Sequence, residues 1–372
     1  MAQAFGIVSF AGNNIRVGEM QNYRPVGAVS FLGRYRVIDF PISNMSNSEI
    51  EQIQVYLKEK PRSVIEHLGT GRHYNINSKS GRLHILYSDF ANAEWSVYNN
   101  DLAAYEENME CIEAVKYPYV VIAPSYMIYT QNYDELLKTH IESGADITLL
   151  YHSVDNAKEY YLNCSTLNLN KQKGVLSLEP NHGNAKNRNI FMDTYVMRKD
   201  LFMELVKKGR KISSMFTLND IVNMACSELD VRGVSHRGFF ASITDFTSYY
   251  NANLSLIDMK NAVTLFDKNW PIYTRTNDSC PTKYYEGASV KSSVISNGCL
   301  IEGTVENSVI GRGCVIKKGA VVKDSVILPG VVIGEDARIE AQVVDKSARI
   351  VHAKELIADP EKPGYVRRND TL

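Results

Sequence analysis

Five basic side chains near the N-terminus are the residues best suited to bind an anionic metabolite. They are Arg24, Arg34 and Arg36, followed by Lys58 and Lys60 in the segment KEKPR. Arginine and lysine pair well with phosphate and carboxylate groups. KEKPR also follows the apolar run QIQVYL, and ligands of parallel sheets gather beyond the carboxyl ends of the strands. We predict that these five residues contribute to an anion site, although such a charged run is more often a solvated face.

Other catalytic or metal-binding patterns are weak. The eight histidines form no HxxxH or HExxH pair, and no GxSxG segment is present. The six cysteines are scattered without a CxxC pair, which disfavours zinc and thioredoxin-like chemistry. We interpret the cysteines as small buried side chains of a protein in a reducing compartment. No metal site is expected from these patterns.

Composition narrows the classes of partner. The formal net charge is −1, which gives no reason to expect nucleic acid or an anionic membrane. No apolar run approaches the ~20 residues that span a bilayer. The first ten residues, MAQAFGIVSF, lack the basic start and long apolar region of a signal peptide. We expect a cytoplasmic protein of two domains with a large core.

The first two-thirds of the chain alternates strand-like and helix-like segments. Strands are predicted at residues 4–10, 52–57, 117–124 and 146–154. A helix is predicted between the last two, starting at Asn132 with Glu135 three residues on and ending at Gly144. Strand, helix and strand at this spacing favour a βαβ unit in a parallel sheet. The chemistry should then lie just after residues 10 and 123.

The last quarter repeats an aliphatic residue at intervals of six. The series is Ile295, Ile301; Ile310, Ile316, Val322; Ile327, Ile333, Ile339; and Val344, Ile350. Gly311 and Gly334 fit the corners between the short strands. This period is typical of a parallel β-helix of stacked hexapeptide coils, whereas a β-sandwich would alternate at period two. We expect an α/β domain over residues 1–260, a connection over 261–283 and a β-helix over 284–372.

Three segments together resemble one enzyme family. LGRYRVIDFPISN (32–44), DKNWPIYT (267–274) and the hexapeptide tail are similar to bacterial glucose-1-phosphate adenylyltransferase, over nearly the whole chain. The pattern is most similar to the D-type subunit that accompanies a catalytic C-type subunit. The resemblance implies a Rossmann-like nucleotidyltransferase domain followed by a left-handed β-helix. It also implies a role in making ADP-glucose from ATP and glucose 1-phosphate, with sugar phosphates as effectors near the domain junction.

Carried over residue by residue, the resemblance finds the phosphate-binding positions altered. The family's GGxGxR loop falls on residues 11–16, where only Gly12 and Arg16 match. Val26 replaces a lysine. We expect at most a degenerate nucleotide loop at Gly12 and Arg16, because glycines let backbone N–H groups approach a triphosphate.

The metal-binding and sugar-phosphate positions are altered as well. Tyr126 stands where the family has its first metal-binding aspartate, and Phe216 stands where it has the second. Glu179 replaces a lysine that holds the sugar phosphate, and Asp193 replaces a small residue near the sugar. A phenol and a phenyl ring are poor Mg²⁺ ligands, and a carboxylate repels phosphate. No catalytic residue, metal or bound cofactor is therefore expected in this chain.

Three hypotheses follow. The first is a regulatory, non-catalytic subunit that pairs with a catalytic homologue, in a heterotetramer whose catalytic partner carries Mg²⁺. The second is an active adenylyltransferase with unusual site residues. The third is a hexapeptide acyltransferase, which would need a histidine near the repeats and has only His352 near the end of the chain. The altered chemistry on a retained scaffold favours the first.

Overall fold

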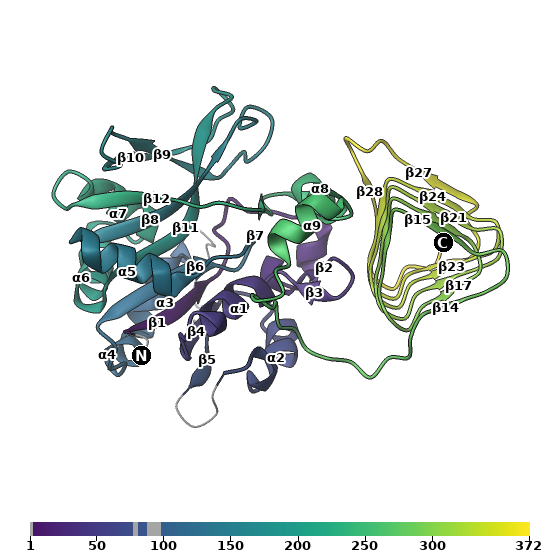
Figure 1. Cartoon of the computed structure of the whole chain (residues 1–372), viewed down its shortest axis with the longest axis horizontal. Helices are drawn as coiled ribbons and strands as arrows, with labels where there is room; N and C mark the ends of the chain where they lie inside the picture. Colours follow the sequence, from purple (N-terminus) through teal and green to yellow (C-terminus); the bar gives the residue numbers. More distant parts are fainter. Residues whose placement is uncertain (1–2, 77–80, 88–97) are drawn as a thin grey trace.

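The computed structural model describes residues 3–76, 81–87 and 98–372, and these form two units side by side (Figure 1). The first unit is built on a mixed nine-stranded sheet. Its strands are β1 (Ala4–Ser9), β4 (Gln52–Leu57), β5 (Arg82–Tyr87), β6 (Tyr119–Pro124), β8 (Ile147–Val154), β9 (Ser165–Leu169), β10 (Val175–Pro180), β11 (Arg188–Arg198) and β12 (Val231–Ser235). Two small antiparallel two-stranded sheets accompany it: β2 (Ser30–Phe31) with β3 (Tyr35–Arg36), and β7 (Met127–Tyr129) with β13 (Phe240–Ser242).

Helices lie around this sheet (Figure 1). They are α1 (Asp39–Asn47), α2 (Arg62–Leu68), α3 (Asp101–Glu107), α4 (Met109–Glu113), α5 (Tyr133–Ser143), α6 (Lys199–Ile212), α7 (Leu218–Ala225), α8 (Phe246–Ser255) and α9 (Met259–Leu265). Short 3₁₀ turns include η1 (Gly18–Asn22), η2 (Val26–Ala28) and η3 (Arg72–Tyr74). No helix in the described part of the chain is long and apolar enough to cross a membrane.

The central strand β1 is buried on both faces, which explains its unbroken apolar sequence. Ala4 and Val8 belong to one hydrophobic core, while Phe5 and Ile7 belong to another on the opposite face. Side chains alternate along a strand, so a strand between two covered faces must be apolar at every position. The strands predicted from such runs are confirmed as β1, β4, β6 and β8.

The predicted helix between β6 and β8 is also confirmed, as α5. The side chain of Asn132 accepts hydrogen bonds from the backbone of Asp134 and Glu135, and Gly144 ends the helix with φ 66°. However, β6 and β8 are not neighbours in the sheet. The long strand β11 lies between them and is antiparallel to both. The sheet is therefore mixed, because a later segment of the chain inserts into the predicted βαβ unit.

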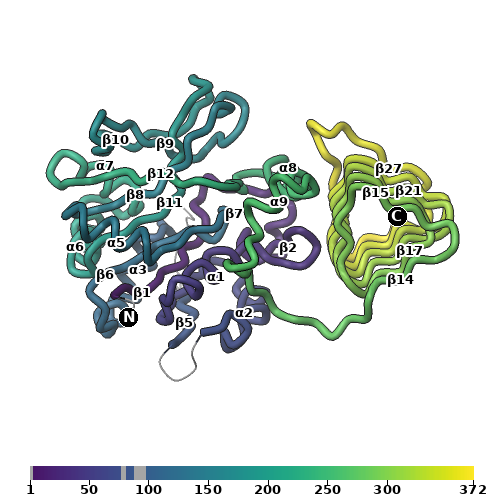
Figure 2. The backbone as a smooth tube through the Cα atoms, viewed as in Figure 1, coloured from purple at the N-terminus to yellow at the C-terminus, as the bar shows by residue number. Residues whose placement is uncertain are grey.

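The second unit is a parallel β-helix, drawn in yellow and green in Figure 2. Each side is a five-stranded parallel sheet, and Leu300 pairs with Lys283 of the coil before and Val315 of the coil after. The first side holds β14 (Lys283–Tyr284), β17 (Leu300–Ile301), β20 (Val315–Ile316), β23 (Val332–Ile333) and β26 (Arg349–Ile350). The second holds β15 (Ser289–Lys291), β18 (Thr304–Glu306), β21 (Val321–Lys323), β24 (Arg338–Glu340) and β27 (Glu355–Ile357). The third holds β16 (Val294–Ile295), β19 (Val309–Ile310), β22 (Val326–Ile327), β25 (Gln342–Val344) and β28 (Gly364–Val366).

The repeated aliphatic residues stack inside the coils. Nine of the ten predicted positions are fully buried, and Ile295 in the first coil packs against them. Gly311 and Gly334 each follow a strand end, where the next coil comes close. A Cβ atom would lie 2.7 Å from Pro329 N at Gly311 and 2.8 Å from Ile350 O at Gly334. The three parallel sheets and this spacing are consistent with a left-handed β-helix.

The segment between the units is partly helical and is anchored to the first unit. Residues 261–265 of the predicted connection belong to α9, and regular strand pairing resumes at β14. The Trp270 indole N–H donates to Asn44 Oδ1 at 2.9 Å, and the Tyr273 N–H donates to Ser43 Oγ at 2.9 Å. The segments LGRYRVIDFPISN and DKNWPIYT therefore contact each other, and these contacts fix the exit of the chain from the first unit.

Candidate functional site

Two cavities open at the carboxyl end of β1, on either side of the loop that follows it. Phe10, Gly12 and Asn13 line both of them. We call the first, of about 480 Å³, the basic cavity, because Arg16, Arg24, Lys58 and Lys60 line it. We call the second, of about 330 Å³, the acidic cavity, because Asp101, Asp193 and Asp220 line it. Both cavities lie in the region after residues 10 and 123, where the sequence analysis places the chemistry.

The basic cavity is lined in part by the loop at residues 11–16, which contains Gly12 and Arg16. Gly12 and Arg16 are both exposed on its wall, and Val26 is a buried part of the same wall, at the start of η2. Lys58 Nζ donates to the side chain of Asn13 and lies 5.9 Å from the Phe10 ring centroid. Burial lowers the pKa of Lys58 from its ordinary value. The wall thus keeps several cations beside the loop while Val26 contributes only an apolar surface.

Lys60 and Arg24 complete the basic wall. Lys60 Nζ donates to the carbonyl oxygen of Gln21 at 2.7 Å. Arg24 is 3% exposed and forms an ion pair with Asp345 of the β-helix, so part of its charge is already compensated. Both residues of the cavity wall are therefore held by other parts of the chain, Lys60 by Gln21 and Arg24 by Asp345 of the second unit.

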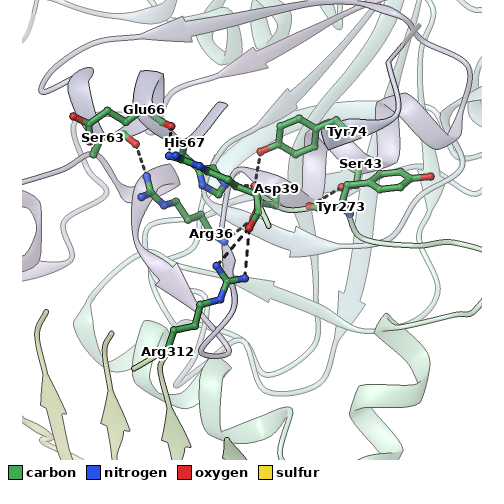
Figure 3. Close-up of polar contacts among 10 residues, drawn as sticks. Arg36, Asp39, Ser43, Ser63, Glu66, His67, Tyr74, Tyr273 and Arg312 are labelled. Carbon is green, nitrogen blue, oxygen red and sulfur yellow. Dashed lines mark hydrogen bonds and ion pairs between the residues drawn. The ribbon is translucent and has the colours of Figure 1, made fainter. Parts of the chain in front are cut away.

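The five predicted basic residues do not form one group. Arg34 is exposed and lines a separate cavity of about 460 Å³ between the two units, together with Arg312. Arg36 donates to the carbonyl oxygen of Ser63, and Figure 3 shows it beside the buried carboxylate of Asp39. Burial lowers the pKa of Arg36. Arg24, Lys58 and Lys60 thus line one cavity, while Arg34 and Arg36 lie elsewhere at the junction.

The buried carboxylate of Asp39 is the centre of a hydrogen-bond network next to Arg36. This carboxylate accepts hydrogen bonds from His67 Nε2 at 2.5 Å, from the Tyr74 hydroxyl at 2.5 Å and from the Arg36 N–H at 2.8 Å (Figure 3). The hydrogen bonds from His67 and Tyr74 and the charge of His67 outweigh burial and hold the pKa of Asp39 below its ordinary value. This network is a buried structural support with its polar groups paired.

The β-helix adds cations that sequence reasoning missed. Burial and repulsion from Arg36, Arg24 and Arg368 lower the pKa of Lys346 to about 7. The chain brings Lys346 and Arg368 to residues more than 300 positions earlier, so no local pattern could have identified them. Arg24, Arg36, Lys346 and Arg368 thus lie near one another at the junction, with Asp345 as a partial counter-charge.

In the acidic cavity two substituted positions pair with each other. The Tyr126 hydroxyl donates a hydrogen bond to Asp193 Oδ2. Burial raises the pKa of Asp193 to about 6 and raises that of Tyr126 well above its ordinary value. Asp193 sits at an irregularity of β11 with φ 43°, a conformation that aspartate tolerates better than most residues.

The other two carboxylates of the acidic cavity, Asp101 and Asp220, accept hydrogen bonds from backbone N–H groups at the starts of helices. Asp101 accepts backbone hydrogen bonds from Leu102 at 2.8 Å and from Leu218 at 3.1 Å, and burial raises its pKa to about 7. Asp220 forms a capping box with Thr217 at the start of α7. Sequence reasoning missed Asp101 and its neighbours Asn99 and Asn100, although an Asn-Asp pair before an apolar run is a helix-start signal.

Glu179 and Phe216 lie away from the cavity. Leu178 and Pro180 line it, but the alternation of side chains along β10 turns Glu179 to the other face, where it is exposed and accepts from Ser177. Glu179 therefore does not face a phosphate position as expected. Phe216 packs against the hydrophobic core beside α6 and α7, immediately before the residues of α7 that line the cavity.

The donor set does not fit a Mg²⁺ ion. Within residues 3–76, 81–87 and 98–372, no group of three or more histidine, cysteine, aspartate or glutamate side chains is placed to hold a metal. Asp193 is engaged by Tyr126, and Asp220 is engaged by the helix cap. Mg²⁺ needs oxygen ligands that converge on one point, and the three aspartates of the acidic cavity are not grouped in this way.

Two family models match the chain. A model described as nucleotidyl transferase matches residues 10–257, and one described as GlmU-like C-terminal hexapeptide matches residues 281–365. The two matches coincide with the sheet-based unit and with most of the β-helix. The fold is therefore that of a nucleotidyltransferase domain followed by a hexapeptide-repeat domain.

Similar proteins cover most of the chain. It is 30% identical to a glucose-1-phosphate adenylyltransferase of Clostridioides difficile, over 89% of this chain and 86% of that protein. It is 31% identical to one of Clostridium perfringens, over 86% and 81%. It is 27% identical to the glycogen biosynthesis protein GlgD of Bacillus subtilis, over 98% and 96%.

Proposed function

Because the chain belongs to the nucleotidyltransferases and, among them, to the glucose-1-phosphate adenylyltransferase family, we propose that it is a regulatory, non-catalytic subunit of that enzyme. Its role would be to modulate the synthesis of ADP-glucose and pyrophosphate from ATP and glucose 1-phosphate for glycogen biosynthesis. The active site and its Mg²⁺ would belong to a homologous catalytic subunit, in a heterotetramer.

The observation that carries this proposal is the pairing of Tyr126 with Asp193 in the acidic cavity. Adenylyl transfer brings two anions together, so it depends on cations and on carboxylates free to hold a metal. Among the described residues, the lining of this cavity includes three aspartates and no lysine, arginine or histidine. Such a cavity would repel glucose 1-phosphate and lacks the ligands to recruit Mg²⁺.

Regulation requires a ligand or partner that contacts two conformations differently. The basic cavity is suited to bind a sugar phosphate or another anionic effector, because the cations Arg16, Lys58 and Lys60 line it. Arg24 lines the same cavity and pairs with Asp345 of the β-helix. An anion bound there would compete with Asp345 for Arg24 and so change how the two units are held together.

The test is to co-express this chain with a catalytic homologue, isolate one complex and measure its kinetics. We expect the complex to differ from the catalytic subunit alone in kcat, KM or effector response by at least about fivefold, the lower end of typical allosteric coupling. If the two proteins purify separately, or if the kinetics are the same with and without this chain, the proposal is wrong.

The second candidate is an active adenylyltransferase with unusual residues. The retained Gly12 and Arg16, with Lys58 and Lys60 nearby, are the features that favour it, since they could still hold a triphosphate. The two candidates differ in a single respect: only the second predicts turnover by this chain without a partner.

A further inference from the structure

The acidic cavity is polar, enclosed by side chains from several elements, and lacks positive charge. Seven asparagines and three aspartates line it, together with Tyr105, Tyr126 and Tyr195. Its volume of about 330 Å³ lies near the lower end of the ~300–1,000 Å³ usual for small-molecule sites. The lining therefore offers many hydrogen-bond partners and several aromatic faces to a small ligand.

Two buried polar atoms in the cavity wall have no partner. Asn99 is 5% exposed and Tyr105 is 1% exposed, and both line the cavity. In the described part of the chain, neither Asn99 Oδ1 nor the Tyr105 hydroxyl oxygen finds a hydrogen bond. A buried polar group left unpaired costs about 1–3 kcal/mol. A ligand hydroxyl would satisfy Asn99 Oδ1, and a second hydroxyl would satisfy the Tyr105 phenol.

The charges of the cavity select against an anionic ligand. Each carboxylate already accepts at least one hydrogen bond: Asp101 from Leu218 and Leu102, Asp193 from Tyr126, and Asp220 from Thr217. An ionised carboxylate has about four lone-pair positions, so each can accept further donors. Uncharged hydroxyl groups supply donors without repulsion, whereas a phosphate would be repelled by the ionised carboxylates and would find no cation among the lining residues.

We infer that the acidic cavity binds an uncharged, polyhydroxylated ligand of the size of a mono- or disaccharide and rejects sugar phosphates. Amide and carboxylate groups would accept and donate hydrogen bonds with its hydroxyls, and the faces of Tyr105, Tyr126 and Tyr195 would cover its C–H surfaces. This binding goes beyond the proposed regulatory function, because this chain can be tested for it without any catalytic partner.

The experiment is calorimetric titration of the full-length chain with D-glucose, maltose, glucose 1-phosphate and glucosamine. We expect glucose or maltose to bind with a dissociation constant on the order of millimolar or tighter, and glucose 1-phosphate at least about tenfold more weakly. Three outcomes would overturn the inference: no binding of either neutral sugar, equal or tighter binding of glucose 1-phosphate, or binding of glucosamine more than about tenfold tighter than glucose, which would indicate a cation site.

Two variants locate the binding in this cavity. Tyr105→Phe removes only the unpartnered hydroxyl, and Asn99→Ala removes the unpartnered acceptor. Each should weaken glucose or maltose binding about three- to tenfold, the effect of one hydrogen bond. Tyr133→Phe is the matched control, because Tyr133 is also a buried tyrosine but pairs with Tyr129 and does not line the cavity. If the control weakens binding as much as the other two, or if neither variant does, the site is not here. Thermal melting of each variant shows whether it is folded.

Discussion

The Tyr126 hydroxyl donates a hydrogen bond to the carboxylate of Asp193, and the two residues stand at positions where the family resemblance expects an aspartate and a small residue. The two substitutions thus compensate each other. The phenol gives the buried carboxylate a donor, and the carboxylate gives the buried phenol an acceptor. An aspartate at position 126 alone would place a second carboxylate beside Asp193. A small residue at position 193 alone would leave the buried Tyr126 hydroxyl without its acceptor.

Restoring an aspartate at position 126 alone should therefore destabilise the protein in a pH-dependent way. In Tyr126→Asp, two carboxylates would face each other, and their repulsion would grow as pH rises past the native pKa of Asp193, which is about 6. We expect a loss of about 1–3 kcal/mol in the free energy of unfolding at pH 8 and a smaller loss at pH 5. Urea unfolding at both pH values measures this difference.

The double variant Tyr126→Asp with Asp193→Gly is the control for this prediction. It removes the facing carboxylate, and glycine accepts the positive φ of position 193 without strain. The stability gained by Asp193→Gly between pH 5 and pH 8 should therefore be larger in the Tyr126→Asp background than in the wild type, where only the burial of Asp193 contributes. Equal losses of stability at pH 5 and pH 8 in the single variant would contradict the claim that the side chains at positions 126 and 193 face each other.

Asp193→Asn should stabilise the protein at neutral pH. The pKa of Asp193 rises from an ordinary 3.8 to about 6 in the folded chain, chiefly through burial. The unfolded chain therefore releases this proton first, and Asp193 lowers stability progressively as pH rises from about 4 to about 6. A shift of this size corresponds to at most about 3 kcal/mol. The gain from Asp193→Asn should be full above pH 6 and absent near pH 3.5, and a constant gain across this range would refute the titration of Asp193.

The buried ion pair between Arg24 and Asp345 should hold the two units in one cooperative structure. Arg24 and Asp345 are 3% and 0% exposed, and Asp345 also accepts from the Tyr365 hydroxyl at 2.7 Å. Asp345→Asn leaves the Arg24 charge buried without its counter-ion, which commonly costs about 3–5 kcal/mol. Calorimetry should then show a lower melting temperature or two separate transitions. Glu19→Gln, which breaks only the exposed pair with Arg367, should change the melting temperature little.

Most of the fold could be predicted from the sequence because its signals are local. The apolar run of β6, the cap at Asn132 and the sixfold spacing of the β-helix each depend on a few neighbouring residues. The insertion of β11 between β6 and β8 could not be predicted in this way, because strand order depends on contacts between distant segments.

The site was predictable in part for the same reason. The loop at Gly12 and Arg16 and the cations Lys58 and Lys60 lie just after strands, so their position beside one cavity follows from the topology. The face of the sheet on which Glu179 lies depends on its position in the pleat of β10, and a shift of one residue in strand register would move its side chain to the opposite face. Lys346 and Arg312 come from the β-helix, and only the docking of the two units brings them near the first one.

The Trp270 indole should matter for stability rather than for ligand binding. It donates to Asn44 at 2.9 Å and is partly buried against the hydrophobic core. Trp270→Phe keeps an aromatic ring but removes the N–H, and we expect a loss of about 1–2 kcal/mol in unfolding free energy. Binding of a neutral sugar should be unchanged. Tyr284→Phe at an exposed position of the β-helix serves as a neutral reference, and a weaker affinity in Trp270→Phe would contradict the structural role.

Lys58 and Lys60 should carry the effector response of a complex with a catalytic subunit. Replacing both with alanine removes two cations from the basic cavity, so activation or inhibition by a sugar phosphate should weaken about tenfold or more in half-saturating concentration. Lys207→Ala and Lys208→Ala, on the exposed face of α6, form the matched control with the same change of charge. An unchanged response in the cavity variant, or an equal change in the control, would place the effector elsewhere.

The most direct test of the central claim is to incubate the purified chain alone with ATP, Mg²⁺ and glucose 1-phosphate. Turnover is measured as the rate of pyrophosphate release. An acidic cavity without cations and with Tyr126 bound to Asp193 predicts no turnover above the background of a mock purification. A rate on the order of 1 s⁻¹ or faster, typical of a working enzyme, would contradict the account and establish the chain as a catalyst in its own right.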